Sequence, residues 1–270
     1  MGKTFKKARN LPTWRRVAVN AWTAPTEATI HGSLDIDATA ALSYIEKLRI
    51  STGQKITISH LVAKALAMAI AKMPEANGIV ARGRLFLRDD VDIFLQVALD
   101  GGVSLSGATI RQADRKSVAE IAKELSEKVA DIRAHRDDAT EKTMDSMRRI
   151  PSRLLRPILR FLEWLQYDHD IDLKWLGVEK DTFGSAMVTN VGMFGLQQGF
   201  APLFPLGRTA IVLLVGEVSD KPVAVAGQVV IRPMLGLHAT VDHRVIDGYH
   251  AGVLASELRK VLLDPQTHME

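Results

Sequence analysis

The sequence contains no cysteine among its 270 residues. Disulfide bonds, thiolate metal ligands and a cysteine nucleophile are therefore excluded. It also has no run of 18 or more apolar residues and no signal-peptide pattern at its start, so we expect neither a membrane span nor secretion. Together these absences favour a cytoplasmic protein.

The composition is that of a soluble globular protein, with 47% hydrophobic and 24% charged residues. We expect one domain over residues 11–270, preceded by a basic tail over residues 1–10. The net charge is +4, and much of the excess lies between residues 3 and 16. This segment is either a solvated arm or a contact for a neighbouring subunit or acidic partner. Nucleic-acid binding is not expected, because no aromatic side chains alternate with the basic ones.

Apolar periodicity predicts helices and strands that mix without a regular strand-helix-strand rhythm. We expect an α/β (α+β) fold, in which a mixed sheet carries helices on one face. The predicted helices span residues 11–24, 38–49, 58–72, 117–135 and 249–263. The predicted strands span residues 26–36, 79–98 with a turn near Arg82 and Gly83, 103–110, 185–190, 210–218 and 223–241.

A histidine follows the last predicted strand directly. His243 lies between that strand and the helix of residues 249–263, with Asp247 and Gly248 behind it. Such a junction can point a side chain into a cleft while the backbone stays rigid. His243 is therefore either a general base or a core histidine that ends the strand. The nearby His238 and His250 also leave open a metal site or a dyad with Asp247.

Four segments carry a resemblance to a known family. They are residues 59–77, 110–121, 183–195 and 242–248, the last reading Asp-His-Arg-Val-Ile-Asp-Gly. These segments resemble, in the same order, motifs of the acyltransferase (E2) cores of 2-oxo-acid dehydrogenase complexes. The last one is similar to the His-x-x-x-Asp-Gly signature of the chloramphenicol acetyltransferase-like fold. The resemblance implies that fold and a CoA-dependent acyltransferase.

The resemblance also implies roles for individual residues. His243 would be the general base that removes the thiol proton of coenzyme A or dihydrolipoamide. Asp247 would be mainly structural, in an ion pair with Arg15, although Arg16 is also possible. Thr189 matches the family's oxyanion donor, and its alternative role is that of a β-branched strand residue. No metal is implied.

Two glycines and an asparagine complete the predicted site. Asn190 and Gly192 are expected to form the turn that lets backbone approach the ligand, and Gly248 follows Asp247. We predict that these three residues contribute to substrate or CoA binding. Coenzyme A would enter as acyl-CoA, and this chain would carry no covalent lipoyl group.

The resemblance further implies partners. A homotrimer or a multiple of trimers is expected, including a 24-subunit cage, with His243 and Thr189 contributed by neighbouring chains. A lipoyl-bearing protein would act in trans.

Two segments depart from the family wording, namely residues 102–110 and 203–209. They leave open which molecule accepts the acyl group. A thiol of the dihydrolipoyl type is the first hypothesis, a small-molecule hydroxyl or amine is the second, and a non-enzymatic oligomeric scaffold is the third.

Residues 147–176 are predicted to be an insertion into the family pattern. Its arginines at positions 153, 156 and 160 lie on a different side from its apolar positions, which suggests a membrane-surface helix, a lid or an oligomer contact. We expect Pro157 to interrupt the helix, and membrane contact is therefore not favoured. Burial against protein is expected for Leu154, Leu155, Ile158, Leu162 and Leu165.

Overall fold

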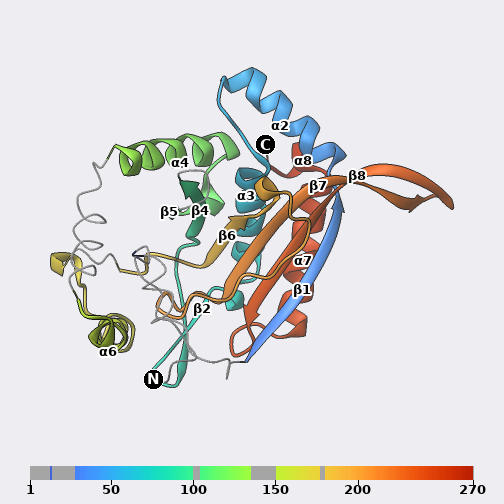
Figure 1. Cartoon of the computed structure of the whole chain (residues 1–270). Coiled ribbons are helices and arrows are strands. Elements are labelled where there is room, and N and C mark those ends of the chain that lie inside the picture. The colour runs from blue at the N-terminus through green and yellow to red at the C-terminus, as the bar shows by residue number, and fades with distance from the viewer. Residues whose placement is uncertain (1–12, 14–27, 100–103, 135–149, 177–179, 270) are drawn as a thin grey trace, which may run out of the picture.

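The computed structural model describes residue 13 and residues 28–99, 104–134, 150–176 and 180–269 (Figure 1). The predicted basic tail, nearly all of the first predicted helix, and Arg15 and Arg16 lie outside these residues.

Six strands form one mixed sheet in the order β1-β8-β7-β6-β4-β5. They are β1 (Thr29–Asp37), β4 (Ile93–Leu99), β5 (Ser104–Ile110), β6 (Ala186–Asn190), β7 (Ile211–Val225) and β8 (Gln228–Asp242). β6 runs parallel to β4 and β7, whereas the other neighbours are antiparallel. A separate hairpin pairs β2 (Gly78–Ala81) with β3 (Arg84–Leu87) around the predicted turn. The prediction of a mixed sheet is confirmed.

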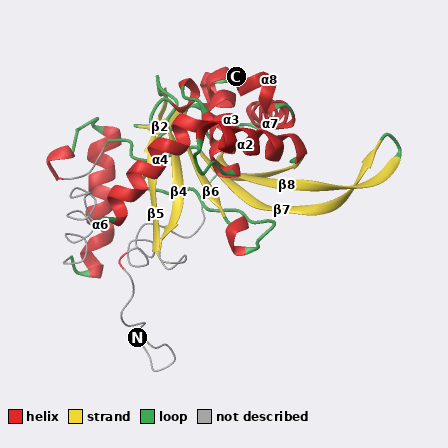
Figure 2. Cartoon of the chain, turned by 90° about the horizontal axis from the view of Figure 1, so that it is seen from above, coloured by secondary structure: helices red, strands yellow, loops and turns green. Residues whose placement is uncertain are grey.

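Helices cover one face of this sheet (Figure 2). They are α2 (Thr39–Thr52), α3 (Ile58–Lys72), α4 (Val118–Arg133), α7 (Gly248–Leu263) and α8 (Pro265–Met269). Short helical turns occur at η1 (Pro74–Ala76), η3 (Ala113–Arg115) and η6 (Gly192–Phe194). α3 is the central helix, because nearly all its side chains from His60 to Ile70 are buried. The main hydrophobic core lies between these helices and the sheet.

The opposite face of the sheet is covered by chain without regular structure. Phe94, Met187 and Val212 form a second apolar cluster there with Phe204, which comes from the segment between β6 and β7. The phenyl rings of Phe94 and Phe204 both contact Phe183. Both faces of the central strands are therefore shielded from water.

β7 and β8 continue past the sheet as a two-stranded arm (Figures 1 and 2). The expected break between residues 218 and 223 was wrong, because β7 runs through Pro222 to Val225. β6 pairs with β7 only as far as Val215, and the described residues place no third strand along the outer part of β7. A proline is tolerated at such an edge, where no third strand needs its missing N–H.

The segment predicted as an insertion forms α6 (Ser152–Glu163), which continues into a π-helical turn, η4 (Trp164–Asp168), and later η5 (Lys174–Leu176). Leu155 and Leu159 are the buried side chains of α6, and they pack against the partly buried Ile150 and Leu206. The helix continues through Pro157, so the expected interruption was wrong. Pro157 removes one backbone hydrogen bond from α6, and the packing of the neighbouring turns compensates for this loss.

Charged groups fix the far end of this helical segment to the body. Arg208 donates to Glu163 at 2.7 Å and also pairs with Asp168. The Tyr167 hydroxyl donates to the carbonyl of Gly207 at 3.1 Å. Burial is the main reason that the pKa of Tyr167 is raised far above its usual value. The segment is thus a packed part of the molecule.

The burial predicted for the apolar positions of this segment is only partly met. Leu155 is buried, and Ile158, Leu162 and Leu165 are half-buried. Leu154 was predicted wrongly, because 54% of its surface is exposed. The body contacts a narrower stripe of α6 than the apolar residues occupy, and Leu154 lies outside that stripe.

Candidate functional site

His243 follows the last residue of β8 in a tight loop that leads into α7. The Asp242 carboxylate accepts from the backbone N–H of Arg244 at 2.9 Å and pairs with its guanidinium. Val245 and Ile246 are buried beneath the loop. Hydrogen bonds of Asp242 and the burial of Val245 and Ile246 therefore both fix the loop, as expected for a rigid strand-to-helix junction.

Among the described residues, one backbone group orients the ring of His243. Nδ1 lies 3.0 Å from the carbonyl oxygen of Ile246. Because a carbonyl only accepts, we assign the proton of the neutral ring to Nδ1. Nε2 then carries the lone pair, and the residue is exposed. This is the tautomer that a base needs when it accepts a proton from a ligand outside the chain.

Asp247 caps the N-terminus of α7. Its Oδ1 accepts from the backbone N–H groups of Tyr249 at 2.9 Å and His250 at 3.1 Å, and it lies 2.7 Å from Nδ1 of His250. The backbone N–H and the ring of His250 are the main groups that hold the pKa of Asp247 below its usual value. Asp247 therefore anchors the helix that ends the His243 loop, and its pairing with Arg15 lies outside the described residues.

Gly248 is the first residue of α7, next to this cap. A Cβ at Gly248 would meet no atom within 4 Å. Packing alone therefore does not require a glycine there.

Thr189 lies near the end of β6 and is half-buried. It pairs with Leu214 of β7, which in turn pairs with His238 of β8. Paired residues share a face of the sheet, and Met187, two residues before Thr189, belongs to the cluster on the face without helices. The hydroxyl of Thr189 therefore lies on the side of the sheet opposite α3 and α7.

Asn190 and Gly192 shape the turn that follows Thr189. Asn190 donates through Nδ2 to the Ser59 hydroxyl at 2.8 Å, which ties β6 to the start of α3. A Cβ at Gly192 would lie 2.6 Å from the backbone nitrogen of Glu217. Both residues thus have packing roles, and the close backbone approach at Gly192 is to β7.

His243 lies beyond the end of β8, whereas Thr189 is level with the middle of the part of β8 that pairs with β1. The start of β6, Ala186, is level with Val241 through Ile211, whereas Thr189 is level with His238. His243 is five residues beyond His238, which corresponds to about 16 Å along the strand direction. The structure thus separates the two residues of a single chain along the strand direction.

The structure also brings together two residues that the sequence analysis did not pair. The Ser33 hydroxyl lies 3.0 Å from Nδ1 of His238, whose Nε2 lies 3.1 Å from the carbonyl oxygen of Gln197. His238 is only 3% exposed and shares its cross-strand row with Thr189 through Leu214. The alternation of side chains along β8 could have predicted that His238 and His243 do not share a face of the sheet. The contact of His238 with Ser33 could not be predicted in this way, because it depends on the pairing of β8 with the distant strand β1.

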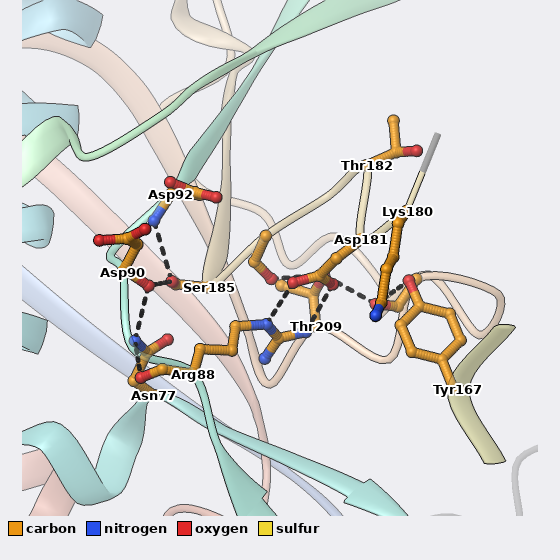
Figure 3. Close-up of polar contacts among 12 residues, drawn as sticks. Asn77, Arg88, Asp90, Asp92, Tyr167, Lys180, Asp181, Thr182, Ser185 and Thr209 are labelled. Carbon is orange, nitrogen blue, oxygen red and sulfur yellow. Dashed lines mark hydrogen bonds and ion pairs between the residues drawn. The ribbon is translucent and has the colours of Figure 1, made fainter. Parts of the chain in front are cut away.

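A network of polar contacts gathers around Arg88 and Asp181 (Figure 3). Arg88 donates to both carboxylate oxygens of Asp181, at 2.6 and 2.9 Å, and to the carbonyl of Gly78 at 3.1 Å. Asn77 donates to the carbonyl oxygens of Arg88 and Asp90. A Cβ at Gly78 would lie 2.7 Å from Val245. The network thus holds Gly78 of β2 close to Val245 in the His243 loop.

Within the described residues, no three histidine or acidic side chains gather in a way that could hold a metal ion. His250 contacts Asp247, and His238 lies in another row, so the metal alternative gains no geometric support. No helix in the described ranges combines the length and the apolar character that crossing a bilayer requires.

Comparison with known proteins gives a family and a fold. The sequence model of the family described as 2-oxoacid dehydrogenases acyltransferase (catalytic domain) matches residues 6–145 and 174–270. It leaves residues 146–173 unmatched, which is most of the predicted insertion. The mitochondrial dihydrolipoyllysine-residue succinyltransferase component of the 2-oxoglutarate dehydrogenase complex of Saccharomyces cerevisiae is 26% identical over 245 residues. The match covers 89% of this chain and 44% of that relative, so the chain spans less than half its length.

Solved structures share the fold. A dihydrolipoamide acetyltransferase of Azotobacter vinelandii superposes with a TM-score of 0.69 at 19% identity, covering 97% of this chain and 93% of that one. The cubic core of a pyruvate dehydrogenase multienzyme complex superposes with a TM-score of 0.67 at 19% identity, covering 98% and 95%. The chain thus has the fold of these E2 catalytic cores.

Proposed function

Because this chain belongs to the family of 2-oxoacid dehydrogenase acyltransferase catalytic domains, we propose that it transfers an acyl group between coenzyme A and a thiol of the dihydrolipoyl type. The observation that carries the proposal is the ring of His243, with Nδ1 on the carbonyl of Ile246 and Nε2 without a partner among the described residues. A scaffold has no need of an exposed histidine held in one tautomer.

In the proposed reaction, Nε2 of His243 removes the proton of the attacking thiol. A free thiol has a pKa of about 8.5, so a base raises the share of reactive thiolate at neutral pH. The thiolate attacks the thioester carbonyl carbon and forms a C–S bond, and the resulting tetrahedral intermediate expels the other sulfur. His243 then returns the proton to the leaving thiolate, so that one thioester and one thiol are consumed and one of each is formed.

The negative oxygen of that intermediate needs a hydrogen-bond donor. We propose the hydroxyl of Thr189 for this role, contributed by a second copy of the chain. The separation of about 16 Å along the strands within one chain supports this division. Asn190 and Gly192 would set the position of Thr189 through the turn after β6, and they would approach the substrate through their backbone.

Asp247 is proposed as a positioning residue. Its cap on α7 holds the helix that follows Ile246, and Ile246 supplies the carbonyl that orients His243. Arg15 is proposed as its ion-pair partner. Gly248, with open space around its Cα, would allow the pantetheine part of coenzyme A to pass close to the backbone.

The division of the site between copies requires an oligomer, and we propose a homotrimer or a trimer-based assembly, including a 24-subunit cage. One of the structural neighbours is itself a cubic core. The acyl donor or acceptor would be a lipoyl group on another protein, acting in trans, while coenzyme A is a substrate that binds reversibly.

The test is an acceptor screen with the purified protein. Acetyl-CoA or succinyl-CoA is mixed with dihydrolipoamide, and the S-acyl product and free coenzyme A are quantified by mass spectrometry. We expect S-acyl-dihydrolipoamide, formed reversibly. Transfer only to hydroxyl or amine acceptors would replace the thiol hypothesis by the small-molecule one. Absence of acyl-CoA turnover with every acceptor would favour the scaffold.

A further inference from the structure

A serine on β1 and a buried histidine on β8 form a hydrogen-bonded pair away from the His243 loop. Ser33 and His238 are direct cross-strand partners, and the Ser33 hydroxyl lies 3.0 Å from Nδ1 of His238. Direct partners point to the same side of a sheet, which for His238 is the side of Thr189. Ser33 is exposed, whereas His238 is buried. Among the described residues, the serine is therefore open to a ligand, and the imidazole behind it is shielded from water.

The second ring nitrogen fixes the tautomer of His238. Nε2 lies 3.1 Å from the carbonyl oxygen of Gln197. Because a carbonyl only accepts, we assign the proton of the neutral ring to Nε2. Nδ1 then carries the lone pair, and the Ser33 hydroxyl donates to it. A serine that donates to an imidazole whose other nitrogen is held by an acceptor has the arrangement that activates a nucleophile.

Two glycines make room for the carbonyl that holds the ring. A Cβ at Gly216 would overlap the carbonyl oxygen of Gln197. A Cβ at Gly236 would lie 3.0 Å from the same oxygen and 2.9 Å from Nε2 of His238. A side chain at either position would push the carbonyl away from the ring. The close approach of Gln197 to His238 therefore depends on both glycines.

A neighbouring pair of the same two residue types has the opposite exposure. His31 and Thr240 are also direct partners, and Nδ1 of His31 lies 3.2 Å from the Thr240 hydroxyl. There the ring is exposed and the hydroxyl belongs to a fully buried residue. A buried hydroxyl cannot attack the carbonyl group of a ligand. Of the two pairs, the one at Ser33 combines an accessible hydroxyl with a buried base.

We propose that Ser33 is a nucleophile, with His238 as its base, that takes an acyl group from a thioester and passes it to water. Nδ1 of His238 removes the hydroxyl proton while Oγ of Ser33 attacks the carbonyl carbon and forms a C–O bond. The C–S bond breaks, and the leaving thiolate takes the proton from Nδ1. Nδ1 then removes a proton from water, and the hydroxide attacks the ester carbonyl. The C–O bond to Ser33 breaks, and Oγ regains a proton from Nδ1, so that one thioester and one water give one acid and one thiol.

An aromatic ring beside the pair favours an uncharged acyl group. The Phe200 ring lies 5.6 Å from the ring of His238 and 4.8 Å from that of His31, measured between centroids. It is 47% exposed and therefore offers an apolar surface next to Ser33. Acetyl or butyryl groups can pack on such a surface without bringing a charge to it. The choice of a thioester donor rests on the proposed function, whereas the activation of Ser33 does not.

The absence of cysteine from the native chain allows that activation to be measured without any acyl transfer. Ser33→Cys places a thiol beside Nδ1 of His238. Ser51→Cys is the matched control, because Ser51 is also exposed but its hydroxyl donates to the carbonyl of Leu48. At pH 7 we expect iodoacetamide to alkylate Ser33→Cys about tenfold faster than Ser51→Cys, because the histidine raises the share of thiolate. Adding His238→Gln should remove the difference, since the amide can bond to Gln197 but is no base. Equal rates in the two single variants would overturn the proposal.

Acyl labelling tests the reaction itself. The native protein is incubated with p-nitrophenyl acetate or acetyl-CoA, quenched in acid, digested and analysed by mass spectrometry. We expect an acetyl ester on Ser33, formed about 100-fold more slowly in His238→Gln. A label confined to other residues, or one on Ser33 that forms at the same rate in His238→Gln, would contradict the proposal. Labelling of Ser33 by p-nitrophenyl acetate, while transfer from acetyl-CoA to dihydrolipoamide fails, would support this inference and count against the proposed function alone.

Discussion

Nδ1 of His243 lies 3.0 Å from the carbonyl oxygen of Ile246, three residues further along the chain. The bond closes a loop whose two ends are held independently. His243 donates its backbone N–H to the carbonyl of Ala28 at 2.6 Å, and Ile246 donates its own to Asp242 at 2.9 Å. Within the described residues the ring is thus oriented by backbone, and we expect Nε2 to be the group that exchanges a proton with a ligand.

This geometry predicts the effect of removing the ring. His243→Ala should lower acyl transfer by about 10² to 10⁴, the usual contribution of general acid–base catalysis. Its side chain is exposed, so the free energy of unfolding should change little. The checks are the steady-state rate with acyl-CoA and dihydrolipoamide and a urea titration of both proteins. Near wild-type activity would remove His243 from the mechanism.

Thr189 is expected to act mainly in the transition state. Thr189→Ala should lower kcat by about 10² to 10³ with little change in KM for acyl-CoA, whereas Thr189→Ser should retain most activity. Both variants shorten the side chain but only the serine keeps a hydroxyl. If alanine and serine reduce the rate equally, the residue only fills its position in β6.

The division of the site between copies predicts complementation. His243→Ala and Thr189→Ala chains should each be nearly inactive, but co-expressed chains should regain about one quarter of wild-type activity in a randomly mixed closed ring. One site in four would combine an intact histidine with an intact threonine from its neighbour. Mixed assemblies that stay as inactive as the separate variants would show that both residues act from the same chain.

A buried histidine in α3 predicts how stability depends on pH. Burial lowers the pKa of His60 to about 4. Because the unfolded chain takes up a proton near pH 6.5 and the folded chain does not, stability is full above pH 6.5 and is lost as the pH falls toward 4. The loss should reach about 2 kcal/mol between pH 6.5 and pH 5.

The test of that prediction is His60→Gln. Nδ1 of His60 accepts from the backbone N–H of Thr57 at 3.2 Å, and a glutamine oxygen can take over this capping contact. Urea titrations at pH 6.5 and pH 5 should show that the variant has lost about 2 kcal/mol of pH dependence. His169→Gln, at an exposed position, is the control, and a histidine effect of equal size there would contradict the assignment to burial.

Local sequence predicted the elements whose pattern is complete within a short window. Residues 58–72 form α3 with the expected bounds, because its apolar run is bounded by Thr57 and Pro74. The turn at Arg82 and Gly83 was likewise predicted. In the structure both residues adopt the left-handed conformation that the hairpin needs. The wrong predictions concern positions whose strand pairing or burial depends on distant parts of the chain. Pro222 is tolerated because no third strand of the described residues reaches it, and Leu154 is exposed because the body covers only part of α6.

The sequence by itself determined that His243 stands between the last long strand and the last long helix, since both elements and the Asp247 cap are encoded within about 30 neighbouring residues. Only the tertiary structure decided where that histidine lies relative to Thr189. Their separation follows from the parallel pairing of β6 with β7 and the antiparallel pairing of β7 with β8. Strand order and register arise from the packing of residues far apart in sequence, and no local pattern contains them.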